Sequence, residues 1–299
     1  MGDAGWFDGI ALLGDLPASE YEDYLRLVGD PSAQDADAGP DTERALTLRR
    51  RVQPFNYTGS QVGHIRPGPD RYLRIVDPRD IEPDRALAHQ RVTVQLTQAL
   101  VARYPGHGTH EILLHFDAGD GGMKDERMQF GSTVRSADGS TPALVGQVLF
   151  SGLRVAADGL SIRLRTINVS SEDDARLLAV LQSDVFRGGL DLAASVGPAI
   201  GLLSQTLGSI ATYFASRASN KPVQDGLLAV GLQRDLVDAP KLRLGSYVLA
   251  QAPSDVGGRL WSWADYVYDR ERGVIVESRN TETAIGYNYI ALGIGRTEG

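Results

Sequence analysis

The sequence predicts an α+β fold: an antiparallel β-sandwich or partly open barrel with one helical hairpin inserted at about residues 171–217. Three observations support it. Apolar and polar residues alternate with a period of two in many short runs after about residue 90, and turn residues separate these runs. The pattern changes once, to three- and four-residue steps, before strand signals return. Because strands and helices do not alternate repeatedly, a parallel doubly wound sheet is not expected.

The chain divides into an acidic, partly irregular N-terminal extension (1–87) and a β-rich domain (88–299). Residues 1–43 contain eleven acidic residues and one arginine, a net of −10, while the whole chain carries −8. The stretch 18–28 has the apolar spacing of a short helix.

Residues 54–84 are rich in proline and glycine, so we expect extended, irregular structure there, with one strand at Tyr72–Val76.

The β-rich domain is expected to hold nine or ten strands, mostly joined by hairpins. Within 160–169 the alternation is regular enough to place Leu160, Ile162 and Leu164 on the core side. Asp-Gly pairs at 138–139 and 158–159 are typical of hairpin turns. The strand candidates are 91–97, 111–116, 127–134, 143–150, 160–169, 227–232, 241–251, 260–268, 273–277 and 287–294.

The inserted hairpin is predicted to contain two helices separated at Gly188-Gly189. The first, 171–186, begins with a serine followed by acidic residues, which is typical of a capped helix start. The second includes 192–214, a stretch without charge that is long enough to cross a bilayer. It could be buried in the protein, pack in an oligomer, or meet a membrane or partner after rearrangement. The residues that would face a membrane or partner are Leu192, Val196, Gly197, Gly201, Leu203, Leu207, Ile210 and Phe214.

Composition excludes several function classes. The chain has no cysteine, so thiol catalysis, thiolate metal sites and disulfides are excluded. The start of the chain lacks the basic region of a signal peptide, and a cytoplasmic location is therefore expected. The acidic balance makes nucleic acid an unlikely partner because phosphate binding needs a dense basic surface.

Histidines are concentrated in one region. His107, His110 and His115, with Asp117 or Asp120, are candidate ligands for a divalent metal. However, His110 and His115 are five residues apart and would point to opposite faces of a strand. A loop histidine pair with one strand histidine is the alternative interpretation.

The segment Gly106-His107-Gly108-Thr109-His110 resembles the catalytic-histidine segment of subtilisin-like serine proteases. That resemblance implies a nucleophilic serine in a Gly-Thr-Ser context, which this chain lacks, so a Ser-His-Asp mechanism is not expected.

Aromatic residues are concentrated near the C-terminus. If 260–268 is one strand, Trp261 and Trp263 share one face, and Tyr266 and Tyr268 share the other. Such residues can form a sugar-stacking platform or simply pack a core.

These observations favour a non-enzymatic interaction or structural module that acts through protein–protein contacts, with another protein or a second copy as partner. No cofactor is expected, because no P-loop or dinucleotide fingerprint occurs. One alternative is a membrane-active effector whose helix 190–214 inserts into a bilayer or assembles. The other is a metal-dependent hydrolase that uses the His107–Asp125 region.

Overall fold

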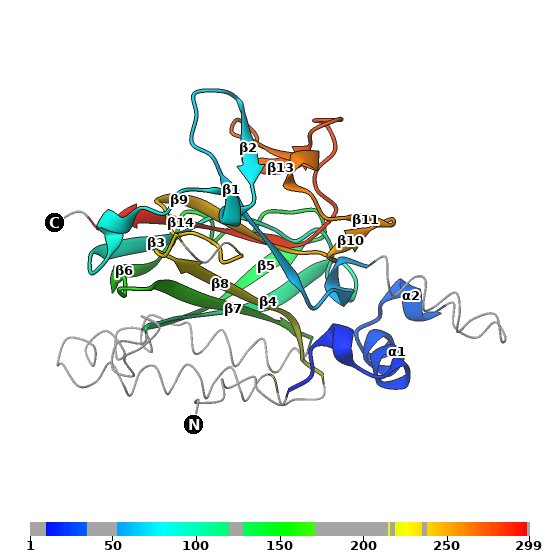
Figure 1. The fold of residues 1–299 in the computed structure, drawn as a ribbon. Coiled ribbons are helices and arrows are strands. Elements are labelled where there is room, and N and C mark those ends of the chain that lie inside the picture. The colour runs from blue at the N-terminus through cyan, green and yellow to red at the C-terminus, as the bar shows by residue number, and fades with distance from the viewer. Residues whose placement is uncertain are drawn as a thin grey trace, which may run out of the picture.

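A computed structural model describes residues 10–34, 53–119, 128–170, 215, 219–234 and 238–297. Most of these residues lie in antiparallel strands (Figure 1). The helices among them are α1 (Ala18–Leu27) and α2 (Pro31–Gln34). Short 3-10 turns are η1 (Leu13–Asp15), η3 (Pro54–Asn56), η4 (Pro78–Asp80), η5 (Arg85–Leu87) and η6 (Trp263–Asp265).

The larger sheet has eight described strands and curls like half a barrel. In spatial order they are β13 (Val274–Glu277), β12 (Tyr266–Asp269), β2 (Tyr72–Val76), β1 (Ser60–Ile65), β9 (Gly245–Gln251), β14 (Tyr289–Arg296), β3 (Arg91–Leu100) and β6 (Val148–Arg154). β1 and β2 share only two residue pairs, and Figure 1 shows β2 and β13 standing out from the sheet at this point.

The smaller sheet contains β5 (Met128–Ala137), β4 (Thr109–Gly119), β7 (Gly159–Val169) and β8 (Lys221–Gly231), in that order. It packs face to face with the part of the larger sheet that contains β9, β14 and β3 (Figure 1). Gln251 of β9 joins the two sheets at one edge, since its Nε2 donates to the Val223 carbonyl of β8 at 2.7 Å.

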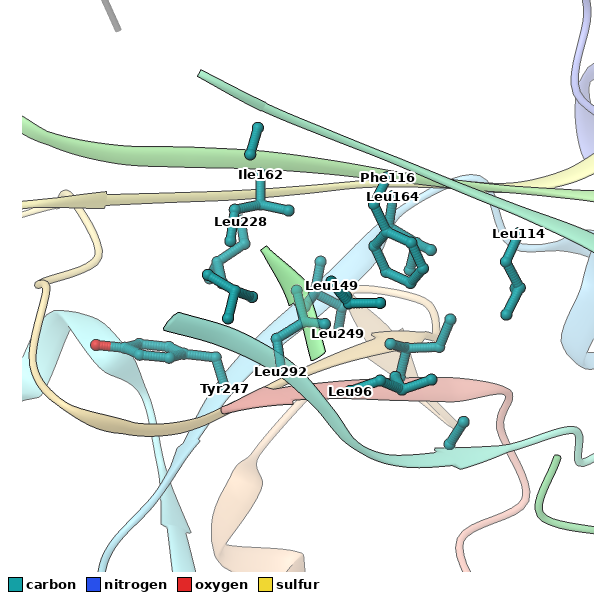
Figure 2. Packing of buried hydrophobic residues seen from close by; sticks show 14 of the residues in the cluster. Leu96, Leu114, Phe116, Leu149, Ile162, Leu164, Leu228, Tyr247, Leu249 and Leu292 are labelled. Carbon is teal, nitrogen blue, oxygen red and sulfur yellow. The ribbon is translucent and has the colours of Figure 1, made fainter. Parts of the chain in front are cut away.

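The inner core, defined as the buried cluster between the two sheets, is largely aliphatic. Figure 2 shows side chains from both sheets meeting there: Leu114, Phe116, Ile162, Leu164 and Leu228 from the smaller sheet, and Leu96, Leu149, Tyr247, Leu249 and Leu292 from the larger. Burying one such side chain stabilises the fold by about 1.5–3 kcal/mol. The prediction that Leu160, Ile162 and Leu164 face the core is confirmed.

A second cluster, the outer layer, lies on the opposite face of β9 and β14. Val248 and Ala250 of β9 and Tyr289 and Ala291 of β14 alternate with the inner-core residues of the same strands. Trp263, Ile275 and Ile285 cover them. The larger sheet is therefore buried on both faces in this region.

The N-terminal residues described here belong to the body of the protein. Helix α1 forms within the predicted 18–28 stretch, and its Tyr21, Tyr24 and Leu25 join the inner core. The Tyr24 hydroxyl accepts from Asn168 Nδ2 of β7 at 2.9 Å. Asp30 is fully buried, and its Oδ2 accepts from Gly106 N at 3.0 Å.

The expected antiparallel β fold is confirmed, and Tyr72–Val76 is strand β2 as predicted. The expectation of irregular structure through 54–84 is wrong at β1, which pairs with β9 along its full length. The predicted helical hairpin lies outside the described residues except for Ala215. The ends of β7 and β8 show only that this segment connects two adjacent antiparallel strands. The division at residue 87 stays a prediction.

The Asp-Gly pairs do not form simple hairpins. Both lie on connections between the two sheets: Asp138-Gly139 between β5 and β6, and Asp158-Gly159 between β6 and β7. Gly139 does adopt the positive φ (74°) expected of a turn. Turn chemistry therefore predicts the reversal of the chain, whereas the inner core decides which sheet the next strand joins.

Candidate functional site

A cleft of about 950 Å³ lies beside the outer layer. Strands β1 and β2 form one side, turn η4 a second, and the segment from Trp261 to Tyr266 a third. We call it the aromatic cleft. Its size is at the upper end of the range usual for small-molecule sites, about 300–1,000 Å³.

Aromatic rings form one wall. The rings of Trp261 and Tyr266 stack with centroids 5.0 Å apart and an interplanar angle of 19°. Trp263 meets Trp261 edge to face at 5.2 Å. Trp263 Nε1 donates to the Val62 carbonyl at 2.8 Å, which fixes this wall to β1. Gly63 of β1 leaves room for the Trp263 ring, because a Cβ at this position would lie 2.6 Å from Trp263 Cε2. Burial raises the pKa of Tyr266 to about 12.

Turn η6 explains how these rings meet. Ser262 precedes the turn, and its Oγ accepts from Ala264 N at 3.3 Å. The turn interrupts the strand that the sequence predicted over 260–268, so the alternation of side chains is not continuous across it. The prediction that Trp261 and Trp263 lie on one face and Tyr266 on the other is therefore wrong.

A carboxylate–guanidinium pair lies on the opposite side, at η4. Asp77 Oδ1 accepts from the backbone N and the Nε of Arg79, each at 2.9 Å. Partial burial opposes ionisation of Asp77, but these hydrogen bonds outweigh it and hold the pKa of the carboxyl below its ordinary value. The pair therefore presents a fixed acceptor next to a fixed donor.

Two polar atoms of residues that line the cleft have no hydrogen-bond partner among the described residues. They are Ser60 Oγ and Trp261 Nε1. Both atoms are fully buried and therefore out of reach of a ligand in the cleft, and Ser60 Oγ points toward Gly226 of β8, between the two sheets.

The hairpin β10 (Asp255–Val256) and β11 (Arg259–Leu260) lies next to the aromatic wall. Gly257 and Gly258 form its turn with φ of +61° and +83°, values that glycine adopts without strain. Leu260 is 81% exposed and Val256 is 38% exposed. We call residues 255–260 the apolar hairpin.

The structure separates the predicted metal ligands. His107 lies exposed in a loop, whereas His110 and His115 are buried on β4. His110 Nε2 lies 2.9 Å from Asp138 Oδ1, and His115 Nε2 lies 3.4 Å from Gln129 Oε1. Burial lowers the pKa of His115 to about 4.

Asp117 follows His115 on β4, while Asp120 lies outside the described residues. Within the described ranges, no three His, Asp or Glu side chains are grouped as a metal site would require.

The candidate residues of the uncharged helix, from Leu192 to Phe214, lie outside the described residues. Of the helices that are described, none has the length and hydrophobicity needed to cross a membrane.

Sequence reasoning identified the aromatic residues but not their polar partners. Asp77 and Arg79 belong to a region expected to be irregular, and no local pattern indicates that η4 lines a cleft with Trp261, about 180 positions later in the chain. Comparison with protein-family models, with curated proteins and with solved structures found no match to this chain.

Proposed function

We propose that this protein is a non-enzymatic interaction module and that the apolar hairpin makes its main protein–protein contact. The exposure of Leu260 is the observation that carries the proposal. At 81% it is the most exposed large hydrophobic side chain among the described residues, and Val256 lies on the same short hairpin. Leu260 also lines a small hollow with Trp261 and Tyr266, and grouped apolar side chains on a surface are typical of interaction sites, whereas single ones are common everywhere.

The surroundings of the hairpin resemble the anatomy of a protein interface. Trp261 and Tyr266, both half-buried, lie beside it and supply rigid aromatic area, which is common at energetic hot spots. Arg259, Arg279 and Glu277 line the hollow that also contains Leu260, and they would form a polar rim around the contact. Burying Leu260 against a partner would contribute about 1.5–3 kcal/mol.

The register of the hairpin favours contact on both of its faces. Leu260 pairs with Asp255 and Val256 pairs with Arg259, so each face carries one apolar and one charged side chain. A partner that only covered one face would leave the other apolar residue in water. A groove that receives the hairpin is therefore the better match.

The test is affinity capture from the native cell with the full chain as bait, followed by mass spectrometry. We expect Leu260→Asp to lose the partner, because it places a charge at the centre of the contact. Leu227→Asp is the matched control: Leu227 is 54% exposed on β8 and receives the same chemical change. If all three baits retained the same proteins, the hairpin would not be the contact.

The other hypotheses from the sequence stay predictions, including the cytoplasmic location, self-association and the helical hairpin of the α+β class. The membrane-active effector depends on residues outside the described part, and release of dye from liposomes, with Gly201→Asp and Leu203→Asp as controls, tests it. The metal-dependent hydrolase gains no support from the described residues, because His110 pairs with Asp138 and lies on the opposite face of β4 from His115.

A further inference from the structure

We propose that the aromatic cleft binds a neutral saccharide. Leu260 and Val256 do not line the cleft, whereas Trp261 and Tyr266 border both the cleft and the hollow beside the apolar hairpin. The inference therefore does not rest on the protein–protein contact proposed above. It rests on the combination, in one cleft, of aromatic rings, paired donors and acceptors, and little net charge.

The aromatic wall suits the apolar side of a sugar ring. A pyranose presents C–H groups on its faces and hydroxyls around its edge, so it needs an apolar surface and polar groups in close proximity. The stacked Trp261 and Tyr266 rings, braced by Trp263, provide a rigid surface of this kind. Their mutual contacts reduce the side-chain entropy that ligand binding would otherwise cost.

The polar side of the cleft suits sugar hydroxyls. A hydroxyl both donates and accepts, and adjacent hydroxyls are best bound by an acceptor next to a donor. Asp77 and Arg79 are held in that arrangement by their own hydrogen bonds.

Charge indicates which saccharides fit. Three carboxylates line the cleft (Asp77, Asp80 and Asp238) against two guanidinium groups (Arg74 and Arg79). This small excess of negative charge disfavours uronates, sialylated sugars and sugar phosphates, because like charges repel across a partly desolvated site. Neutral hexose or N-acetylhexosamine units are the expected ligands.

A proline-rich peptide is the main competing ligand, since such peptides also bind aromatic-lined grooves. That mode needs a series of apolar slots and few polar groups. Here the rings form only one wall, and η4 and β2 supply charged side chains on the others. The cleft therefore favours the saccharide.

The experiment titrates the full chain with maltotriose, cellotriose and triacetylchitotriose, using tryptophan fluorescence and calorimetry. Trigalacturonate and a decaproline peptide are the competing probes. We expect at least one neutral trisaccharide to bind with a Kd of about 1 mM or tighter, and trigalacturonate to bind more weakly. Arg79→Gln should weaken binding roughly fivefold, because it removes one hydrogen-bonding group.

Leu260→Asp and Leu227→Asp are controls and should leave the saccharide affinity unchanged. Circular dichroism spectra and melting temperatures of all variants show whether a loss of binding reflects unfolding. The proposal is overturned if no neutral trisaccharide binds at about 20 mM. It is also overturned if binding is insensitive to Arg79→Gln in folded protein, or if decaproline binds the cleft and the saccharides do not. Loss of the protein partner in Leu260→Asp with saccharide binding intact would support both proposals separately.

Discussion

The two faces of β9 and β14 are both buried, but by different kinds of side chain. Toward the smaller sheet, Leu249 and Leu292 pack in the inner core among aliphatic residues and Phe116 (Figure 2). Toward the outside, Val248 and Tyr289 pack beneath Trp263 and its aromatic neighbours. The inner core is sealed between two sheets, whereas the outer layer continues into the aromatic cleft, where its rings are only half-buried.

The inner core and the outer layer should therefore contribute to different properties, the first to stability and the second to binding. An aliphatic cluster closed on all sides tolerates little loss of volume, because its neighbours cannot move to fill a cavity. Aromatic residues at a cleft can be partly exposed and still pack, and their polar atoms remain near solvent. We therefore expect substitutions in the inner core to change the free energy of unfolding most, and substitutions around the cleft to change binding most.

Adjacent residues of β9 provide the most direct test of this difference, and the largest expected effect. Leu249 faces the inner core and Val248 faces the outer layer, and both are fully buried. Leu249→Ala should lower the free energy of unfolding by about 2–5 kcal/mol. Val248→Ala should cost less, on the order of 1–2 kcal/mol, since it removes fewer methyl groups.

Urea unfolding followed by circular dichroism measures both values. An equal or larger loss in Val248→Ala would show that the outer layer is as important for stability as the inner core.

Gly245 gives the next largest effect. It begins β9 with φ of +134°, and a Cβ there would lie 2.8 Å from Nε2 of the buried His64 on β1. Gly245→Ala should destabilise the protein by about 2–3 kcal/mol through backbone strain and this clash. Gly257→Ala is the matched control: Gly257 has φ of +61° but open space around its Cα, so strain alone should cost about 1 kcal/mol.

Thermal unfolding compares the two variants. In the background of His64→Ala the extra cost of Gly245→Ala should shrink. If it did not, the close approach of His64 would not be the cause.

Acidification should have the smallest of these effects. His64 pairs with Tyr247 across β1 and β9, and burial lowers its pKa to about 4. The unfolded chain therefore binds more protons than the folded protein between about pH 6.5 and pH 4. Stability should be fully present above pH 6.5 and fall as the pH drops to about 4, because protons bind the unfolded chain first.

His115 contributes in the same direction, because its pKa is also lowered to about 4. Urea midpoints measured from pH 7.5 to 4.5 should show a shallower decline in His64→Gln than in the wild type. Parallel curves would mean that His64 is not buried in its neutral form.

Local sequence predicts some elements well and others not at all. Strand β7 was predicted with its buried face because Leu160, Ile162 and Leu164 alternate without interruption. Helix α1 was predicted from apolar spacing alone. Strand β3 continues to Leu100, beyond the predicted run 91–97, because pairing with β14 extends to that residue.

The candidate site was predicted only in part. The concentration of tryptophan and tyrosine near the C-terminus indicates either core packing or a sugar-stacking platform. In the structure these rings pack in the outer layer, and some of them also line the aromatic cleft. Their grouping was not predictable, because η6 changes which side of the chain each ring occupies.

The sequence by itself determined that the chain forms antiparallel strands with alternating buried faces, because a period of two is a local property of the residues. Only the tertiary structure decided that Asp158-Gly159 passes the chain to the other sheet, that the predicted metal ligands His107, His110 and His115 have separate surroundings, and that Asp77 and Trp261 line one cleft. Those outcomes depend on which strands pair across long separations. Such pairing is set by the complementary packing of two sheets rather than by any single segment.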